Sequence, residues 1–158
     1  MNDLPNAATL ATLVTNVTKT MFGMSFSLAE ENSGGVSPLQ ALPPWRTVVL
    51  LIRGGRPITV AIASDERGGK TLGGAMFSCA PDDVDTEMVD DSLRELVNIV
   101  AGQVKSAMGL DQTLGLPKVL ELEEATEPAG ALTWRGATLR NQEKEVKVWV
   151  AITEAVVQ

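Results

Sequence analysis

One stretch of the chain places polar side chains of catalytic character at helical spacing. Asp91, Glu95, Asn98, Gly102 and Lys105 follow one another at steps of three and four residues, so a helix would stack them along a single face. The first two are acids, the third is a neutral carboxamide, and the fourth has no side chain. Such a ridge combines carboxylates, which accept hydrogen bonds, with an amide that both donates and accepts them.

The alternative interpretation of this ridge is a solvated helix face. Glu95 and Asn98 would then contact only each other, as neighbours at i and i+3. Two features argue against it. Asparagine is a poor residue inside a helix because its amide competes with the backbone, and Gly102 adds a further penalty of about 1 kcal/mol relative to alanine. Together they indicate that another molecule comes close to this face.

The helix that carries the ridge is predicted for residues 85–108. Its opposite arc is apolar and forms the expected buried face, made of Leu93, Leu96, Val97, Val100, Val104 and Ala107. Acids gather at and just inside its start, namely Asp82, Asp83, Asp85, Glu87, Asp90 and Asp91. We interpret them as favourable to the helix dipole and to solubility. A calcium loop is the alternative, but its central glycine is missing.

Composition excludes several classes of function. The 158-residue chain has no histidine and one cysteine, Cys79, which excludes histidine-based nucleophile pairs and bases, an internal disulfide and a Cys/His zinc cage. Thirteen Lys and Arg against 20 Asp and Glu give a formal charge of -7, so nucleic acid and anionic membranes are poor partners. No window reaches the roughly 20 apolar residues of a membrane span, and no signal-peptide pattern is present. We expect a cytoplasmic protein.

The other hydrophobic patterns predict an α+β domain. Two more helices are expected at residues 6–21, ended by Gly23, and at 64–77, capped by Ser64 or Asp65 in spite of four glycines. Six strands are predicted at 25–31, 47–53, 57–63, 119–123, 131–139 and 145–153. Hairpin turns are expected at 54–55 and 141–144, and a long flexible loop at about 32–44. The chain is therefore predicted to be one domain, residues 1–158, in which three helices pack on a largely antiparallel sheet of about six strands.

Other candidate sites carry weaker signals. Gly68-Gly69-Lys70-Thr71 follows a predicted strand, as a phosphate-binding loop does, but Ser64 stands where that motif needs its first glycine. Cys79 has no histidine to activate it and is interpreted as an idle or buried thiol. The three tryptophans are scattered, and we expect core or interface positions for Trp45, Trp134 and Trp149. Nucleotide binding therefore remains only an alternative.

The stretch Asp91-Ser-Leu-Arg-Glu95-Leu-Val-Asn98-Ile-Val-Ala-Gly102 resembles the signature of the CheC/CheX/FliY phosphatases of bacterial chemotaxis. Their pattern is Asp or Ser, three residues, Glu, two residues and Asn, followed by an apolar pair, Ala and Gly. The order and length of the elements resemble this family from about residue 10 to 155. A single copy of the Glu/Asn motif is similar to CheX rather than to CheC, which has two.

The resemblance implies a substrate and a mechanism. The substrate would be the aspartyl phosphate of a CheY-type response regulator, which brings its own Mg²⁺, so that this chain needs no cofactor or metal. Asn98 would orient the attacking water and Glu95 would pair with the regulator's active-site lysine. Asp91, Arg94, Gly102 and Lys105 would contact the partner. A homodimer is expected, as in CheX-like members. The alternative is a catalytically silent, dimeric module that binds or adapts a response regulator.

Overall fold

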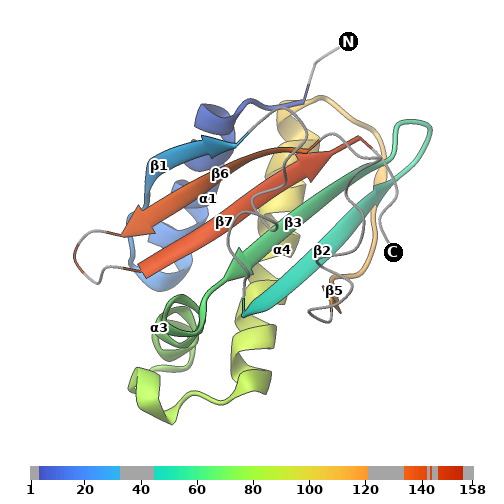
Figure 1. Cartoon of the computed structure of the whole chain (residues 1–158). Helices are drawn as coiled ribbons and strands as arrows, with labels where there is room; N and C mark the ends of the chain where they lie inside the picture. Colours follow the sequence, from blue (N-terminus) through green and yellow to red (C-terminus); the bar gives the residue numbers. More distant parts are fainter. Residues whose placement is uncertain (1–3, 33–44, 121–133, 142, 144–145, 155–158) are drawn as a thin grey trace.

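The computed structural model describes residues 4–32, 45–120, 134–141, 143 and 146–154 (Figure 1). Its helices are α1 (Ala7–Phe22), α3 (Glu66–Phe77), the 3-10 turn η1 (Pro81–Asp83) and α4 (Thr86–Ala107). Its strands are β1 (Ser27–Asn32), β2 (Arg46–Arg53), β3 (Ile58–Ser64), β4 (Thr113–Leu114), β5 (Lys118–Leu120), β6 (Arg135–Asn141) and β7 (Val146–Thr153). The predicted α+β class is confirmed.

The strands form one antiparallel sheet in the order β1-β6-β7-β3-β2-β4, with β5 also paired to β2. Helices α1 and α4 cover one face of this sheet, and α3 lies at its end beside the start of α4 (Figure 1). Alternate residues of the central strands face these helices and are fully buried, for example Val48, Leu50 and Ile52 of β2. Helix α4 thus packs against this face of the sheet.

The opposite face of the sheet carries a second, smaller apolar cluster. It consists of Val49, Ala61, Ala63, Leu120, Trp134, Trp149 and Ala151. Both of these tryptophans are almost completely buried, and Trp45 is half-buried against the main core. The expected core position is confirmed for Trp134 and Trp149, and Trp45 packs against the edge of the main core.

Helix ends follow the local chemistry of the sequence. The side chain of Asn6 caps α1 by accepting a hydrogen bond from the backbone N–H of Thr9 at 2.8 Å, and Gly23 ends that helix with φ of 66°, a backbone conformation that favours glycine. Asp65, one of the two predicted caps, caps α3 by accepting from the N–H of Gly68 at 2.6 Å. Local capping therefore defines both helices.

The glycines of α3 are explained by close packing. All four are buried, and a Cβ on any of them would lie only 2.6–2.7 Å from a neighbouring atom. These neighbours belong to β7, α4 and the segment between α3 and α4; they are the carbonyl oxygens of Lys147 and Cys79 and the methyl groups of Val89 and Val84. Glycine lowers the helix propensity of this segment, but it allows the axis of α3 to lie closer to its neighbours than any side chain would permit.

Several predicted boundaries are corrected. The strand predicted at 131–139 begins at Arg135 and continues to Asn141, although residues 131–133 lie outside the described part. The two-residue strand β4 was not predicted, since so short a segment has no periodicity and forms only because β2 offers it a free edge. The predicted loop is outside the described residues beyond position 32, as are 121–123 of the fourth predicted strand and residues 142 and 144 of the turn at 141–144.

Replacement of Gly68 by alanine tests the packing of α3. Gly68→Ala should lower the free energy of unfolding by about 1–3 kcal/mol, the usual cost of overpacking, because the new methyl group meets the backbone oxygen of Lys147. The matched control is Gly102→Ala in α4, where a Cβ would meet a neighbouring atom only at 4.0 Å, an ordinary contact distance, and alanine should add up to about 1 kcal/mol. Urea unfolding measures both values. A Gly68→Ala protein as stable as the parent would contradict the packing argument.

Candidate functional site

The helix α4 carries the polar ridge identified in the sequence. Its first turn is fixed by Asp85, whose carboxylate accepts a hydrogen bond from the N–H of Met88 at 2.8 Å. The predicted buried face is confirmed for Leu93, Leu96 and Val97 and for the two valines that follow, all with no exposed surface. Ala107 is the exception. As the last residue of the helix it is exposed, because the core ends before it.

Glu95 and Asn98 lie on the exposed arc of α4, opposite this buried face. Among the described residues, none forms a hydrogen bond or an ion pair with either side chain, and the two do not hydrogen-bond to each other. The solvated-face interpretation expected a contact between them. The carboxylate and the amide are instead both open to an external molecule.

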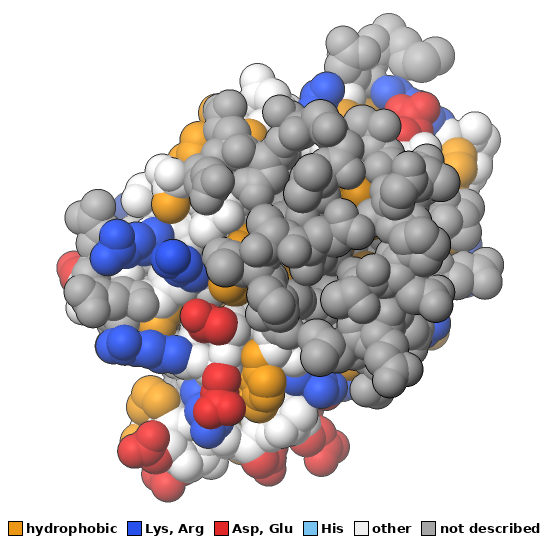
Figure 2. Space-filling view, in the orientation of Figure 1, with side chains coloured by type: hydrophobic (Ala, Val, Ile, Leu, Met, Phe, Trp, Pro, Cys, Tyr) orange, Lys and Arg blue, Asp and Glu red, His pale blue; other side chains and the backbone are white. Residues whose placement is uncertain are grey.

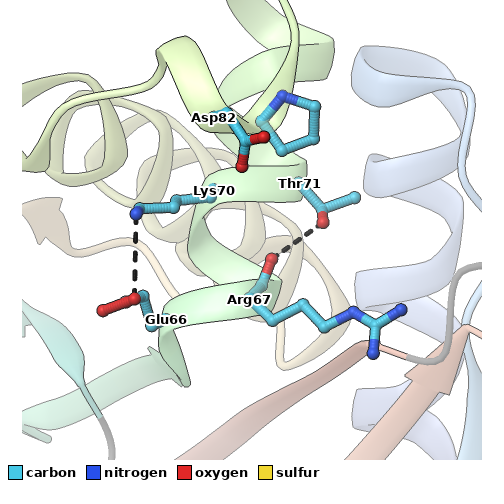
Figure 3. Close-up of a pocket in the computed structure, with 6 residues that line it drawn as sticks. Glu66, Arg67, Lys70, Thr71 and Asp82 are labelled. Atoms are coloured by element: carbon cyan, nitrogen blue, oxygen red, sulfur yellow. Dashed lines mark hydrogen bonds and ion pairs between the residues drawn. The ribbon is translucent and has the colours of Figure 1, made fainter.

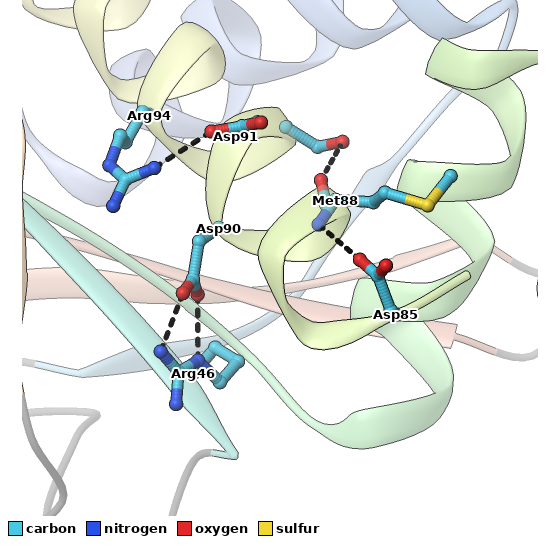
Figure 4. Close-up of polar contacts among 7 residues, drawn as sticks. Arg46, Asp85, Met88, Asp90, Asp91 and Arg94 are labelled. Atoms are coloured by element: carbon cyan, nitrogen blue, oxygen red, sulfur yellow. Dashed lines mark hydrogen bonds and ion pairs between the residues drawn. The ribbon is translucent and has the colours of Figure 1, made fainter.

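Asp91 and Arg94 form an ion pair one turn before this pair of side chains. Nη1 of Arg94 donates to Oδ1 of Asp91 at 2.8 Å, and both side chains are substantially exposed (Figure 4). The contact holds the guanidinium at the exposed surface of α4. The ridge thus begins with a cation and an anion that a partner can reach.

Gly102 and Lys105 continue the ridge toward the end of α4. A Cβ at Gly102 would meet only Cδ1 of Leu114, at 4.0 Å, which is ordinary contact distance. The packing of the described residues therefore does not require glycine at this position, in contrast to the four glycines of α3. Lys105 is half-buried beside it. The structure brings all six sequence-predicted site residues onto the outward side of one helix.

Arg46 and Asp90 form a second ion pair, which the sequence did not indicate. Nε and Nη2 of Arg46 donate to the two carboxylate oxygens of Asp90 at 2.7 and 2.6 Å (Figure 4). Asp90 is only 8% exposed. The interpretation of Asp90 as part of a solvated acidic run is therefore wrong. Its carboxylate faces the sheet and ties the first turns of α4 to the start of β2, a two-point contact that opposes rotation of the helix.

The remaining acids of that run are exposed and lie near one end of the molecule. Figure 2 shows red side chains at the end occupied by α3 and η1. Asp82, Asp83, Asp85 and Glu87 are exposed. Within the ranges that the structure describes, no group of three or more acidic or cysteine side chains is arranged to hold a metal ion.

The Gly68–Thr71 segment does not form a phosphate-binding loop. Both glycines lie inside α3. The N–H of Gly68 donates to the side chain of Asp65, and the N–H of Gly69 donates to the backbone carbonyl oxygen of Asp65. These amides are thus unavailable to a phosphate. Lys70 and Thr71 line a shallow cleft between α3 and η1 (Figure 3), where Nζ of Lys70 lies 3.7 Å from a carboxylate oxygen of Glu66. Lys70 is thus paired with Glu66, and the segment lacks the free backbone amides of a nucleotide-binding loop.

Within the part of the chain that the structure describes, every helix is too short or too polar to cross a membrane. Cys79 is half-buried and carries a free thiol.

Comparison with known proteins places this fold. Residues 46–132 match the family model described as chemotaxis phosphatase CheX. That range starts at β2 and includes the whole of α4 with its ridge. A search of curated protein sequences finds no match.

Solved structures share the fold at low sequence identity. A CheC-like superfamily protein from Shewanella sp. PV-4 is 17% identical, with a TM-score of 0.69 over 91% of this chain and 93% of that one. The CheX chain of a CheX–CheY–BeF₃–Mg²⁺ complex from Borrelia burgdorferi is 16% identical, with a TM-score of 0.69 over 91% and 94%. A chemotaxis protein CheX from Desulfovibrio desulfuricans is 16% identical, with a TM-score of 0.67 over 90% and 94%.

Removal of the charge on Asp90 tests how α4 is held. Asp90→Asn should lower the free energy of unfolding by about 1–3 kcal/mol, because it removes the negative charge that accepts two hydrogen bonds from the mostly buried guanidinium of Arg46. Asp91→Asn is the matched control on the same helix and should cost less than about 1 kcal/mol, since its pair with Arg94 is exposed to solvent. Urea denaturation of both variants measures the difference. Equal losses would contradict a special role for the Arg46–Asp90 pair.

Proposed function

This chain belongs to the CheX family of chemotaxis phosphatases, and we propose that it hydrolyses the aspartyl phosphate of a CheY-type response regulator. The observation that carries the proposal is the exposure, without any described intramolecular partner, of both Glu95 and Asn98 on one helix face. A relative of the same fold has been solved together with CheY, BeF₃ and Mg²⁺, which supports a CheY-type partner for this chain as well.

The chemistry requires positioning more than strong acid–base groups. Water attacks phosphorus, the bond between phosphorus and the aspartate oxygen breaks, and the carboxylate leaves with the bonding electron pair while the water gives up its proton to solvent or to the phosphate formed. An acyl phosphate is already activated, and the regulator supplies Mg²⁺ and a lysine. The phosphatase then needs only to hold water in line with the leaving group. A chain without histidine can do this.

Asn98 is proposed to orient the attacking water. Its carboxamide accepts a hydrogen bond from water through Oδ1 and can donate one to a phosphoryl oxygen through Nδ2. Because the group is neutral, it brings no negative charge toward the phosphate. A carboxylate at this position would repel the phosphoryl oxygens.

Glu95 is proposed to pair with the active-site lysine of the regulator, one turn from Asn98. This pair would fix the register of α4 in the regulator's cleft. Asp91, Arg94 and Lys105 would contact the regulator around it, and Gly102 would admit the partner's loops where any side chain would collide. The mixture of acidic and basic groups along the ridge gives orientation rather than general attraction.

The assembly and the location of the protein are part of the same proposal. A homodimer is proposed on the resemblance to CheX-like members, and sedimentation of the purified chain tests it. The substrate implies action in the cytoplasm, where response regulators receive their phosphate. Mg²⁺ would arrive with the phosphorylated regulator.

Asn98→Ala should reduce the acceleration of phosphate release from a cognate regulator by at least about 100-fold, the loss that misplacement of a reacting group can cause. Folding should survive, because the side chain is exposed. Gln103→Ala is the control, since it removes an exposed carboxamide from the same helix away from the ridge. Loss of radioactive label from the regulator measures the rate.

The parent protein gives the first outcome of this assay. If it binds the phosphorylated regulator and leaves its half-life unchanged, the chain is a catalytically silent binding module. If Asn98→Ala retains full acceleration, the role of the amide is refuted.

Gly102→Gln should separate docking from stability. Glutamine favours the helix, and its Cβ would meet only Cδ1 of Leu114 at ordinary contact distance, so the thermal midpoint should stay the same or rise. The longer side chain would occupy the space proposed for the regulator, and the KM for the phosphorylated regulator should rise at least about tenfold. An unchanged KM would show that no partner approaches Gly102.

A further inference from the structure

Leu116 is unusually open to solvent. It is 87% exposed, whereas Phe77 and Leu28, the other exposed large hydrophobic residues of the described chain, are 42% and 37% exposed. Single exposed leucines are common on protein surfaces and need no explanation by themselves. Leu116 differs from such isolated leucines because its backbone is restrained and its turn begins beside the ridge of α4.

The turn that carries Leu116 is held tightly. The N–H of Gly115 donates to the carbonyl oxygen of Leu51 in β2 at 2.7 Å. A Cβ at Gly115 would lie 2.8 Å from the same oxygen, so only glycine permits this approach. Pro117 restricts the backbone on the other side, and β5 begins at the next residue. The leucine is therefore presented on a restrained backbone, which lowers the entropy lost when a partner covers it.

This turn begins beside the ridge of α4. Leu114, the last residue of β4, places its Cδ1 4.0 Å from the position of a Cβ on Gly102. Leu114 is also paired with Ile52 of β2, which fixes its place at the edge of the sheet. Leu116 follows two residues later. The turn that carries Leu116 therefore begins within contact distance of Gly102, a residue of the ridge.

We propose that Leu116 is a docking residue for the receiver domain of the response regulator and inserts into an apolar depression on its surface. The inference rests on the proposed function and adds a contact outside α4. The ridge itself is charged and polar, and such contacts contribute orientation but little net affinity because they lose hydration on binding. Leu116, once it is buried in the complex, would supply the apolar contact that the ridge lacks. The regulator is the occupant because the turn that carries Leu116 begins at Leu114, which lies next to Gly102, where the regulator is proposed to approach α4.

Leu116→Ser tests the inference, with Leu28→Ser as the matched control. Leu28 lies on β1, at the opposite end of the strand order from β4, so the two variants remove an exposed leucine from opposite edges of the sheet. Affinity is measured with the regulator in its beryllofluoride and Mg²⁺ form. Leu116→Ser should weaken binding about tenfold, the effect of losing an interface anchor, and should raise KM without changing kcat. Leu28→Ser should change neither quantity, and both thermal midpoints should stay near the parent value.

The outcomes separate the inference from the proposed function. If the parent binds the regulator and Leu116→Ser binds equally well, the docking role of Leu116 is overturned while the phosphatase proposal stands. If the parent neither binds nor dephosphorylates any candidate regulator, both fail. If Leu116→Ser leaves regulator binding intact but dissociates an oligomer in sedimentation, the leucine contacts a second copy of this chain, and the inference is likewise overturned.

Discussion

The burial of one arc of α4 against the sheet is the constraint on which the site depends. Leu93, Leu96, Val97 and their neighbours have no exposed surface, so the opposite arc can only face outward. Removing these side chains from water contributes about 1.5–3 kcal/mol each, far more than any surface contact of the ridge can offset. The direction of Asn98 is thus a consequence of core packing and does not rely on a hydrogen bond of its own.

The Arg46–Asp90 pair adds direction to that packing. Apolar contacts tolerate small rotations of a helix, whereas a bidentate pair with bonds of 2.6 and 2.7 Å does not. The contact joins the start of α4 to the first residue of β2. Close approach of α3, which is possible because of its four glycines, supports the same end of α4. At Gly102, toward the C-terminal end of α4, no neighbouring atom lies as close as those around the glycines of α3.

The chemistry proposed for this surface fits the composition of the chain. A chain without histidine and with a formal charge of -7 is poorly suited to bind phosphate by itself. It suits a reaction in which the partner provides the metal and the cation, and this chain contributes one neutral amide. In the proposed mechanism the chain needs few catalytic groups because the substrate is already activated.

Local sequence determined the elements and the exposed stripe, because periodicity, caps and hairpin glycines act over a few residues. It predicted α1, α3, α4, the central strands and the positions of Glu95 and Asn98 on one face. Only the tertiary structure could decide what depends on distant contacts. Asp90 looked like its acidic neighbours until Arg46, 44 residues away, was brought against it. The glycines of α3 acquired a reason only from β7, α4 and residues 79–84, and β4 exists only as a partner of β2. Gly102 has no crowded neighbour of that kind, and this difference could not be read from a pattern that gives every glycine the same meaning.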